Sequence, residues 1–377
     1  MAKEKLELKA VQEAIASSSA GWQAGTTSVS ELSEEDKVIL LGYTPAPGAP
    51  SLQDQERSCE AALSNYLAQS AANFSNSYGA PAALDWRNNG GNFVTPVKSQ
   101  GSCGSCVAFG VIASVESQIK MLRGASYAID LSEAHFFYCH ARSEGRNCGY
   151  NNDPKGGWWP ENAMKLFQSQ GVTEEAFYPY TAGDQNCTGK LAGWDSRLTK
   201  IAGYSKINGI EAIKEYIATK GPVEACYSVY QDFYNYRSGV YRYTSGTLLG
   251  GHCVCIVGYD SAGGYWICKN SWGTNFGESG FFKIAFGQCG IEGSVYGATG
   301  IVNNYNISGV KVQGLWATNE TRNAWVFLSN GQGWKKIGNL NDTSFINILT
   351  QLTSAKATNS NVNVVIKDSL IQQVYVL

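Results

Sequence analysis

The 377-residue chain has few of the features that mark a polyanion binder or a membrane protein. Charged residues make up only 16% of it, and the 29 Lys plus Arg nearly balance the 31 Asp plus Glu. A protein with so little net charge does not attract a polyanion over long range, so nucleic-acid binding is not expected. No apolar run approaches the roughly 18 residues that a membrane span needs.

An export signal is also missing from the first residues, Met1-Ala-Lys-Glu-Lys-Leu6, which lack the basic, apolar and small-residue blocks of a signal peptide. Cysteine is present in an odd number, 11, so at least one thiol is free or bridges two molecules if the others are paired. The cysteines of the loop-rich region favour disulfides, and therefore a secreted protein or another oxidising compartment. Those in apolar, strand-like runs favour buried thiols.

What the chain does have is aromatic residues, with 10 Trp, 21 Tyr and 14 Phe, enough to build a globular core. Residues 1–81 predict two short amphipathic helices. The first is marked by Leu8, Val11 and Ile15 at helical spacing, and the second begins at Ser33 in a capping arrangement with Asp36. From residue 64 to 83 the chain is small and polar, which is typical of a linker open to proteolysis.

Residues 82–302 predict an α+β domain. A helix is expected from Cys106 to Met121, with one buried stripe, and another near 160–170. The stripe consists of Phe109, Ile112, Val115, Ile119 and Leu122. The later part carries β-branched and aromatic runs with glycine breaks at 221–229, 251–259 and 264–269, which predict strands. A helical lobe beside a β lobe leaves a natural cleft between them.

Residues 303–377 change composition again, toward Asn, Thr, Ser and Val. They predict strands at 310–316, 324–329 and 333–337, a helix at 343–356, and strands at 362–367 and 371–377. Three strands, a helix and two strands suit a small OB-like barrel. We therefore expect a small β-rich C-terminal module.

One group of residues predicts nucleophilic catalysis. Cys106 would stand at a helix N-terminus, where the helix dipole and free N–H groups favour the reactive thiolate. His252 opens a glycine-flanked strand and can serve as proton acceptor and donor, while Asn270 can orient its ring. Trp272 could cover the bond between His252 and Asn270 and keep water from it.

Parts of this group are also compatible with other roles. Cys103 and Cys106 alone could form a redox dithiol or half a zinc site. A second close Cys or His pair for zinc is missing, as is a βαβ pattern for a thioredoxin-like motif. A buried structural role is the alternative for His252. The three residue types together favour the catalytic interpretation.

Over about residues 82 to 302 the sequence resembles the papain-like cysteine proteases of the papain and cathepsin group. The resemblance rests on motifs that occur in the family's order: Leu84-Asp-Trp-Arg87, Val94-Thr-Pro-Val-Lys-Ser-Gln-Gly-Ser-Cys-Gly-Ser-Cys106, Leu131-Ser-Glu133, Lys155-Gly-Gly157, Tyr178-Pro-Tyr180, Gly251-His252, Val257-Gly-Tyr259 and Lys269-Asn-Ser-Trp-Gly-Thr274 with Gly277-Glu278. His252 follows Cys106 by 146 residues, within the family's spacing.

The resemblance implies a papain-like two-lobed fold, with a helical left lobe, a β-rich right lobe and the active-site cleft between them. It implies that Cys106 is the nucleophile, His252 the base and acid, Asn270 the orienting residue, and Gln100 an oxyanion-hole donor. Gly156 and Gly157 would pair with the substrate backbone. An apolar S2 pocket would be lined by Trp158, Trp159, Cys226, Gly250, Cys253 and Ser294, and Trp272 would complete the substrate-binding set.

The resemblance also implies disulfides between Cys103 and Cys148 and between Cys139 and Cys187. The chain departs from the family at Val107, where an aromatic residue is usual, and it lacks the family's partner for Cys289. The pairing of Cys59, Cys226, Cys255 and Cys268 is left open.

The expected protein is an autoinhibited peptidase precursor without metal or cofactor. Its partners are peptide or protein substrates and its own pro-segment, residues 1–81, as an intramolecular inhibitor. The C-terminal module would bind a glycan or a protein, or mediate assembly. Two alternatives remain: a transpeptidase or acyltransferase with the same triad, and a non-catalytic binding protein on the same fold.

Overall fold

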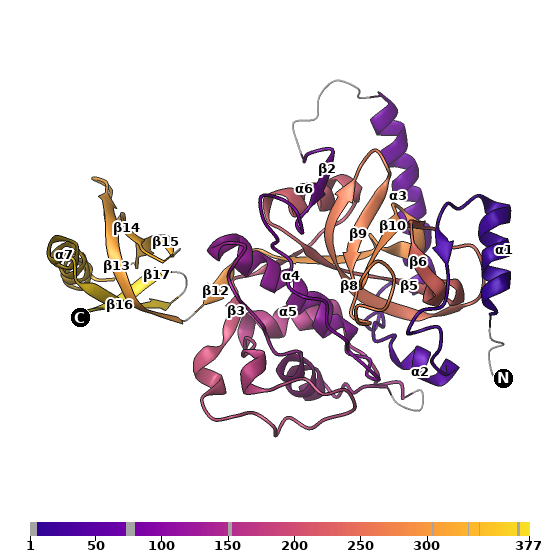
Figure 1. Ribbon diagram of the computed structural model, residues 1–377, viewed down its shortest axis with the longest axis horizontal. Helices are drawn as coiled ribbons and strands as arrows, with labels where there is room; N and C mark the ends of the chain where they lie inside the picture. Colours follow the sequence, from indigo (N-terminus) through magenta and orange to yellow (C-terminus); the bar gives the residue numbers. More distant parts are fainter. Residues whose placement is uncertain are drawn as a thin grey trace.

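The computed structural model describes residues 6–72, 80–149, 153–303, 305–330, 332–338, 340–367 and 370–377. Figure 1 shows a large body that contains the N-terminal helices and the two lobes, with a small barrel at one end. Across the described residues, every helix is too short or too polar to span a membrane.

The right lobe is an eight-stranded sheet, ordered β4-β11-β5-β8-β9-β10-β7, with β2 paired to β8. Its strands are β2 (Ala83–Asp85), β4 (Tyr204–Lys206), β5 (Val223–Tyr230), β7 (Val240–Tyr241), β8 (Leu248–Asp260), β9 (Tyr265–Lys269), β10 (Phe281–Ala285) and β11 (Ser294–Ala298). The three strands expected from apolar runs are β5, β8 and β9. They pair as antiparallel neighbours within the sheet, and their residues are buried on both faces because helices pack against the sheet.

The left lobe is built around α4 (Cys106–Arg123) and α5 (Pro160–Ser169), with a π-helical segment at His135–Ala141. The predicted one-sided stripe of α4 is wrong: all residues from Cys106 to Ile119 are buried, whereas Leu122 is 64% exposed. The helix lies between the two lobes and is therefore covered on every side (Figure 1). The α+β, two-lobed fold class is confirmed.

The N-terminal region wraps this body with α1 (Leu8–Ser18), α2 (Glu34–Ile39) and α3 (Leu52–Ala72), and with the short strand β1 (Gln23–Ala24) paired to β6 (Tyr236–Ser238). The two expected helices are α1 and α2, and Ser33 caps α2 by accepting from the Asp36 N–H at 3.1 Å.

The sequence pattern gives no sign of α3, and the expected linker from residue 64 is wrong as far as Ala72. The reason is tertiary: α3 lies on the right lobe, where the Tyr66 ring packs edge-on against Phe286 at 6.0 Å. This packing overrides the small, polar composition. Residues 73–79, the rest of that linker, lie outside the described residues.

The C-terminal region forms a closed barrel in the order β13-β14-β15-β17-β16. Its elements are β13 (Tyr305–Ala317), β14 (Ala324–Leu328), β15 (Gly333–Ile337), α7 (Asp342–Thr358), β16 (Asn361–Lys367) and β17 (Leu370–Val376). The third and fifth strands pair in parallel and the helix joins the third to the fourth, which is the topology of an OB fold. Just before the barrel, β12 (Ile301–Asn303) pairs with β3 (Thr199–Ile201) of the catalytic body.

Candidate active site

Cys106 is the first residue of α4, so its thiol lies at the positive end of the helix dipole. The side chain is fully buried, and the backbone N–H groups of Cys253, Gly42 and Val107 face the sulfur. Burial nevertheless raises the pKa of the Cys106 thiol to about 12. In this form of the protein the sulfur is therefore protonated at neutral pH and unreactive.

His252 and Asn270 lie together, since β8 carries the first and the loop after β9 carries the second. The Nε2 atom of His252 is 2.8 Å from Oδ1 of Asn270, and the Trp272 ring lies over the imidazole with centroids 4.5 Å apart. Burial lowers the pKa of His252 to about 4, so the ring is neutral. The Leu40 backbone of the N-terminal segment lies close enough to the ring to oppose part of this lowering.

Gln100 is held in one orientation next to the nucleophile. Its Oε1 accepts from the Ser271 hydroxyl at 2.7 Å, which turns Nε2 toward the cleft. That Nε2 group donates to the Leu40 carbonyl at 3.1 Å and to the Cys103 carbonyl at 2.8 Å. A side-chain amide that binds a peptide carbonyl beside a cysteine is the arrangement expected of an oxyanion-hole donor.

The cleft is occupied by the N-terminal segment Leu40–Tyr43. Tyr43 N donates to the Gly251 carbonyl at 3.0 Å, and Trp158 N donates to the Gly42 carbonyl at 2.8 Å. A Cβ placed on Gly42 would lie 1.9 Å from the carbonyl oxygen of Gly104, so only glycine fits there. The backbone of Gly42 is thus in direct contact with the backbone of Gly104, in the loop that precedes Cys106.

Tyr43 fills a pocket beside the cleft and is only 4% exposed. Its ring belongs to the buried cluster that contains Cys226 and Cys253, and Ser294 lies within hydrogen-bonding reach of its hydroxyl. The same hydroxyl is 3.0 Å from Nε2 of Gln55 on α3. Three of the residues expected in the S2 pocket, Cys226, Cys253 and Ser294, therefore lie around the Tyr43 side chain of the N-terminal region.

The glycines at 156 and 157 allow close backbone approach, as a Cβ on Gly157 would lie 2.2 Å from the Gly42 carbonyl oxygen. The tryptophans that follow do not lie as expected for pocket walls. The indole of Trp158 is fully buried and donates to Glu144 at 2.7 Å, so its contact with the cleft is its backbone N–H. Trp159 stacks under the guanidinium of Arg146 at 4.8 Å.

Glu224 is a residue of this site that the sequence analysis missed. Its Oε1 accepts from the thiols of Cys226 and Cys253 at 3.0 and 2.8 Å, and burial raises its pKa to about 7. The three side chains offer ligand atoms within 4.8 Å of one another and could hold a metal ion. Only the cross-strand register of β5 and β8 reveals the cluster, and the sequence carries no motif for it.

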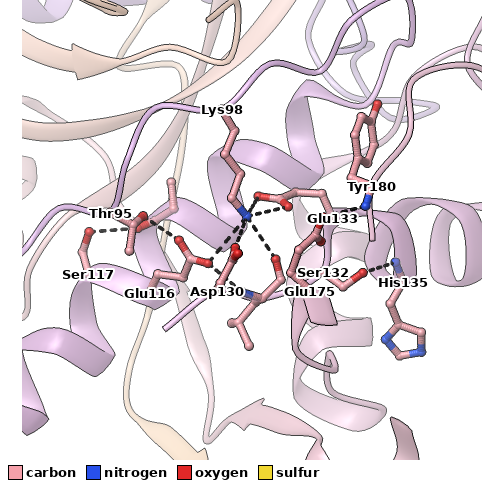
Figure 2. Close-up of polar contacts among 12 residues, drawn as sticks. Thr95, Lys98, Glu116, Ser117, Asp130, Ser132, Glu133, His135, Glu175 and Tyr180 are labelled. Carbon is pink, nitrogen blue, oxygen red and sulfur yellow. Dashed lines mark hydrogen bonds and ion pairs between the residues drawn. The ribbon is translucent and has the colours of Figure 1, made fainter. Parts of the chain in front are cut away.

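Figure 2 shows a network of ion pairs and hydrogen bonds around Lys98 and Glu116, a residue of α4. Thr95 donates to Glu116 on α4 at 2.6 Å and accepts from Lys269, the residue before Asn270, at 2.9 Å. Lys98 lies 2.8 Å from Glu133 and 2.6 Å from Asp130. The network therefore links the helix of the nucleophile to the strand that leads to Asn270.

Disulfides join Cys103 to Cys148 and Cys139 to Cys187, the two pairs that the resemblance implies. The first closes the loop that precedes Cys106. The other seven cysteines are free and buried, Cys59 and Cys289 among them. Burial raises the pKa of the Cys59 thiol to about 12, so it too is protonated at neutral pH.

Comparisons with known proteins agree with this geometry. The sequence profile of the papain family cysteine proteases matches residues 80–299. A gut-specific cysteine proteinase of Caenorhabditis elegans is 35% identical over 227 residues, which are 53% of this chain and 67% of that protein. Bovine cathepsin S is 36% identical over 219 residues, or 56% of this chain and 62% of that protein, so the match spans less than two thirds of its length.

Among solved structures, a digestive procathepsin L2 proteinase from the larval midgut of Tenebrio molitor superposes with a TM-score of 0.56 at 27% identity. The match covers 78% of this chain and 88% of that one. A precursor fold, with its N-terminal segment present, is therefore among the structures that this chain is similar to.

Proposed function

Because the chain belongs to the papain family of cysteine proteases, we propose that it is a cysteine endopeptidase made as an autoinhibited precursor, with Cys106 as nucleophile. The observation that carries the proposal is the hydrogen bond from Gln100 Nε2 to a peptide carbonyl, that of Leu40, above the N-terminus of α4. A substrate carbonyl bound at this position would be polarised next to the thiol.

The proposed chemistry is acyl transfer. Once the N-terminal segment has left and water reaches the site, the burial that raises the pKa of Cys106 is relieved. The imidazole of His252 takes the thiol proton, and the thiolate attacks the carbonyl carbon while Gln100 Nε2–H and the Cys106 N–H bind the oxyanion. His252 then protonates the leaving amine, and water hydrolyses the thioester. Asn270 orients the imidazole throughout.

Residues 1–81 are proposed to be the inhibitory pro-segment, in line with the precursor fold of the similar structures. In a substrate, the P2 residue precedes the carbonyl that enters the oxyanion hole. Here the order is reversed, because Tyr43, in the proposed S2 pocket, comes three residues after Leu40, whose carbonyl binds Gln100. The segment therefore runs opposite to a substrate and presents no scissile bond to Cys106. We propose that cleavage after α3, between Ala72 and Ala83, releases it.

The proposed S2 pocket favours a hydrophobic or aromatic P2 side chain, since it already holds Tyr43. Burial raises the pKa of the Glu224 carboxyl to about 7, so at neutral pH it is only partly ionised and offers little charge to a basic residue. A P2-varied peptide library tests this. A preference for Arg above all apolar residues would contradict the pocket assignment.

The decisive experiment labels the purified protein with an irreversible thiol-protease inhibitor, before and after cleavage, and maps the modified residue. We expect label on Cys106 only after cleavage, and no peptide hydrolysis by Cys106→Ala or His252→Ala variants that fold normally. Hydrolysis by Cys106→Ala at the wild-type rate would refute the mechanism. Nothing in the described site favours a transpeptidase or a non-catalytic role.

For the C-terminal barrel, residues 305–377, we propose a binding or assembly role outside catalysis. The observation in favour is that the barrel has a hydrophobic core of its own, which, within the described ranges, contains no residue of the active site.

A further inference from the structure

The outer face of the first three barrel strands carries an unusual concentration of aromatic residues. In β14 the alternate residues Ala324, Val326 and Leu328 are buried inside, so Trp325 and Phe327 point outward. The strand register places Trp316 of β13 opposite Trp325, and Trp334 of β15 opposite Phe327. The rings therefore form two adjacent rows across three strands.

A glycine lets these rings lie close to the sheet. Gly314 of β13 is paired with Phe327, and a Cβ on it would lie 3.3 Å from Cη2 of Trp334. The Trp334 indole thus extends over β13 at the position where a side chain is missing. Phe327 supports it edge-on, with ring centroids 5.3 Å apart.

These rings remain accessible, since Trp316 and Trp334 are each 49% exposed. They line a hollow of about 590 Å³ together with Trp325 and Asn323. That volume falls within the roughly 300–1,000 Å³ of sites for small ligands. The outward residues of β16 on the same barrel are instead Asn361, Asn363, Val365 and Lys367, so the aromatic face is local.

The charged groups around this face cancel, which indicates the chemistry of its ligand. Arg322 is paired with Asp342 at 2.9 Å, and Glu320 accepts from Asn323. Lys336 lies over the Trp325 ring, 5.9 Å from its centroid. A single-stranded nucleic acid needs a positively charged groove along its backbone, and the side chains of this rim sum to zero.

Polar but uncharged groups complete the rim. Asn323 accepts from the Trp325 indole N–H at 3.1 Å and donates to Thr318 at 3.2 Å, so its amide is fixed beside the ring. A ligand with apolar ring faces and hydroxyl edges matches this surface. Sugar C–H groups pack on the negative faces of indoles, and hydroxyls bond to the amide and ammonium groups at the edge.

We propose that this aromatic face, formed by Trp316, Trp325 and Trp334 with Asn323 at its rim, binds a neutral oligosaccharide. The proposal rests on the binding role suggested for the barrel and is independent of the peptidase activity. It assigns the C-terminal barrel the task of holding the enzyme on glycan-bearing material.

The test uses the full-length Cys106→Ala protein, which does not digest itself. Isothermal titration measures binding of neutral hexasaccharides of β-linked glucose, β-linked N-acetylglucosamine and α-linked glucose, and of a thymidine oligonucleotide. We expect at least one hexasaccharide to bind with an affinity that is unchanged between about 50 and 500 mM salt. Trp325→Ala and Trp334→Ala should each weaken it by about tenfold or more.

Tyr375→Ala is the matched control, because Tyr375 is a 55% exposed aromatic residue on β17 of the same barrel, and it should leave binding unchanged. Trp316→Ala, at a similarly exposed position, repeats the test if another variant unfolds. Salt-sensitive binding of the oligonucleotide through the same tryptophans would overturn the sugar assignment but keep a binding role for the barrel. Binding of none of the probes, or binding that survives the tryptophan substitutions, would overturn the proposal.

Discussion

The two ends of the chain are attached to the catalytic body in different ways. Buried residues of the N-terminal segment, Val11, Trp22, Val29 and Leu40, belong to the hydrophobic cluster of the right lobe. Among the described residues, the core of the C-terminal barrel is a cluster of its own, without a residue from the catalytic body. We therefore expect the segment to need the catalytic body for its folded structure and the barrel to fold by itself. Substitutions in each end test this difference.

The largest change in the activity of the uncleaved precursor is expected from Gly42→Val, because this residue of the N-terminal segment lies in the cleft itself. A side chain here meets the Gly104 carbonyl, and such overpacking costs about 1–3 kcal/mol. The uncleaved precursor should therefore become active, by up to about a hundredfold over its basal rate. Peptide hydrolysis by the uncut chain measures this. Ala49→Val, on an exposed residue of the same segment, is the control, and a Gly42→Val precursor that stays silent would argue against the cleft assignment.

Trp22→Ala attacks the same segment away from the cleft. The indole packs on Tyr236 and Tyr241, with ring centroids 6.1 and 5.2 Å away, and a buried Trp→Ala change costs about 3–5 kcal/mol. We expect a lower melting temperature of the catalytic body together with higher precursor activity. Leu32→Ala, at a 39% exposed position, should change neither. Loss of stability without any activation would mean that docking and inhibition are separate.

Leu352→Ala is the counterpart in the barrel. This side chain of α7 is fully buried in the barrel core, so its truncation should cost about 2–5 kcal/mol. Only the barrel's unfolding transition should move in calorimetry, while peptidase activity stays the same. A shift of the catalytic transition by the same amount would show that the two units unfold together.

Acid should destabilise the catalytic body more than the barrel. Burial holds the pKa of His252 at about 4, so the folded protein keeps the ring neutral while the unfolded chain protonates it near 6.5. This contribution to stability is complete above pH 6.5 and is lost as the pH falls to about 4, by about 3 kcal/mol. In a Cys106→Ala background, His252→Gln should remove this part of the pH dependence. The barrel lacks histidine and serves as the internal reference.

The smallest effect is expected from truncation after Val302. The shortened protein should keep its folding and, after cleavage, a peptidase rate within about twofold of the full chain. A soluble but inactive product, or an unfolded one, would place the barrel within the catalytic unit.

Much of this architecture could be predicted from the sequence because it depends on local pattern. The barrel strands follow period-two alternation and turn residues, and their predicted bounds differ from the observed ones by few residues except at the start of β13. Cys106, His252, Asn270 and Gln100 could be picked out because they stand in specific motifs. The disulfide pairs followed from family spacing.

What could not be predicted depends on contacts between distant segments. The length of α3 is set by the lobe on which it packs, and the full burial of α4 by its place between two lobes. Glu224 reaches two thiols only because β5 and β8 pair in one register. The placement of Leu40–Tyr43 in the cleft likewise has no local signal, because Gly42 and Tyr43 are explained only by the loop and the pocket that they meet there.

The bond from the Trp22 indole to the Arg242 carbonyl joins residues 220 positions apart, and it has a consequence for biosynthesis. The N-terminal segment leaves the ribosome before the lobe on which it docks, and Arg242 is made only 220 residues after Trp22. At about 5–20 residues per second, the segment waits for roughly 10–40 seconds without a partner. During this time a chaperone has the opportunity to bind the apolar side chains of the segment, Trp22 among them.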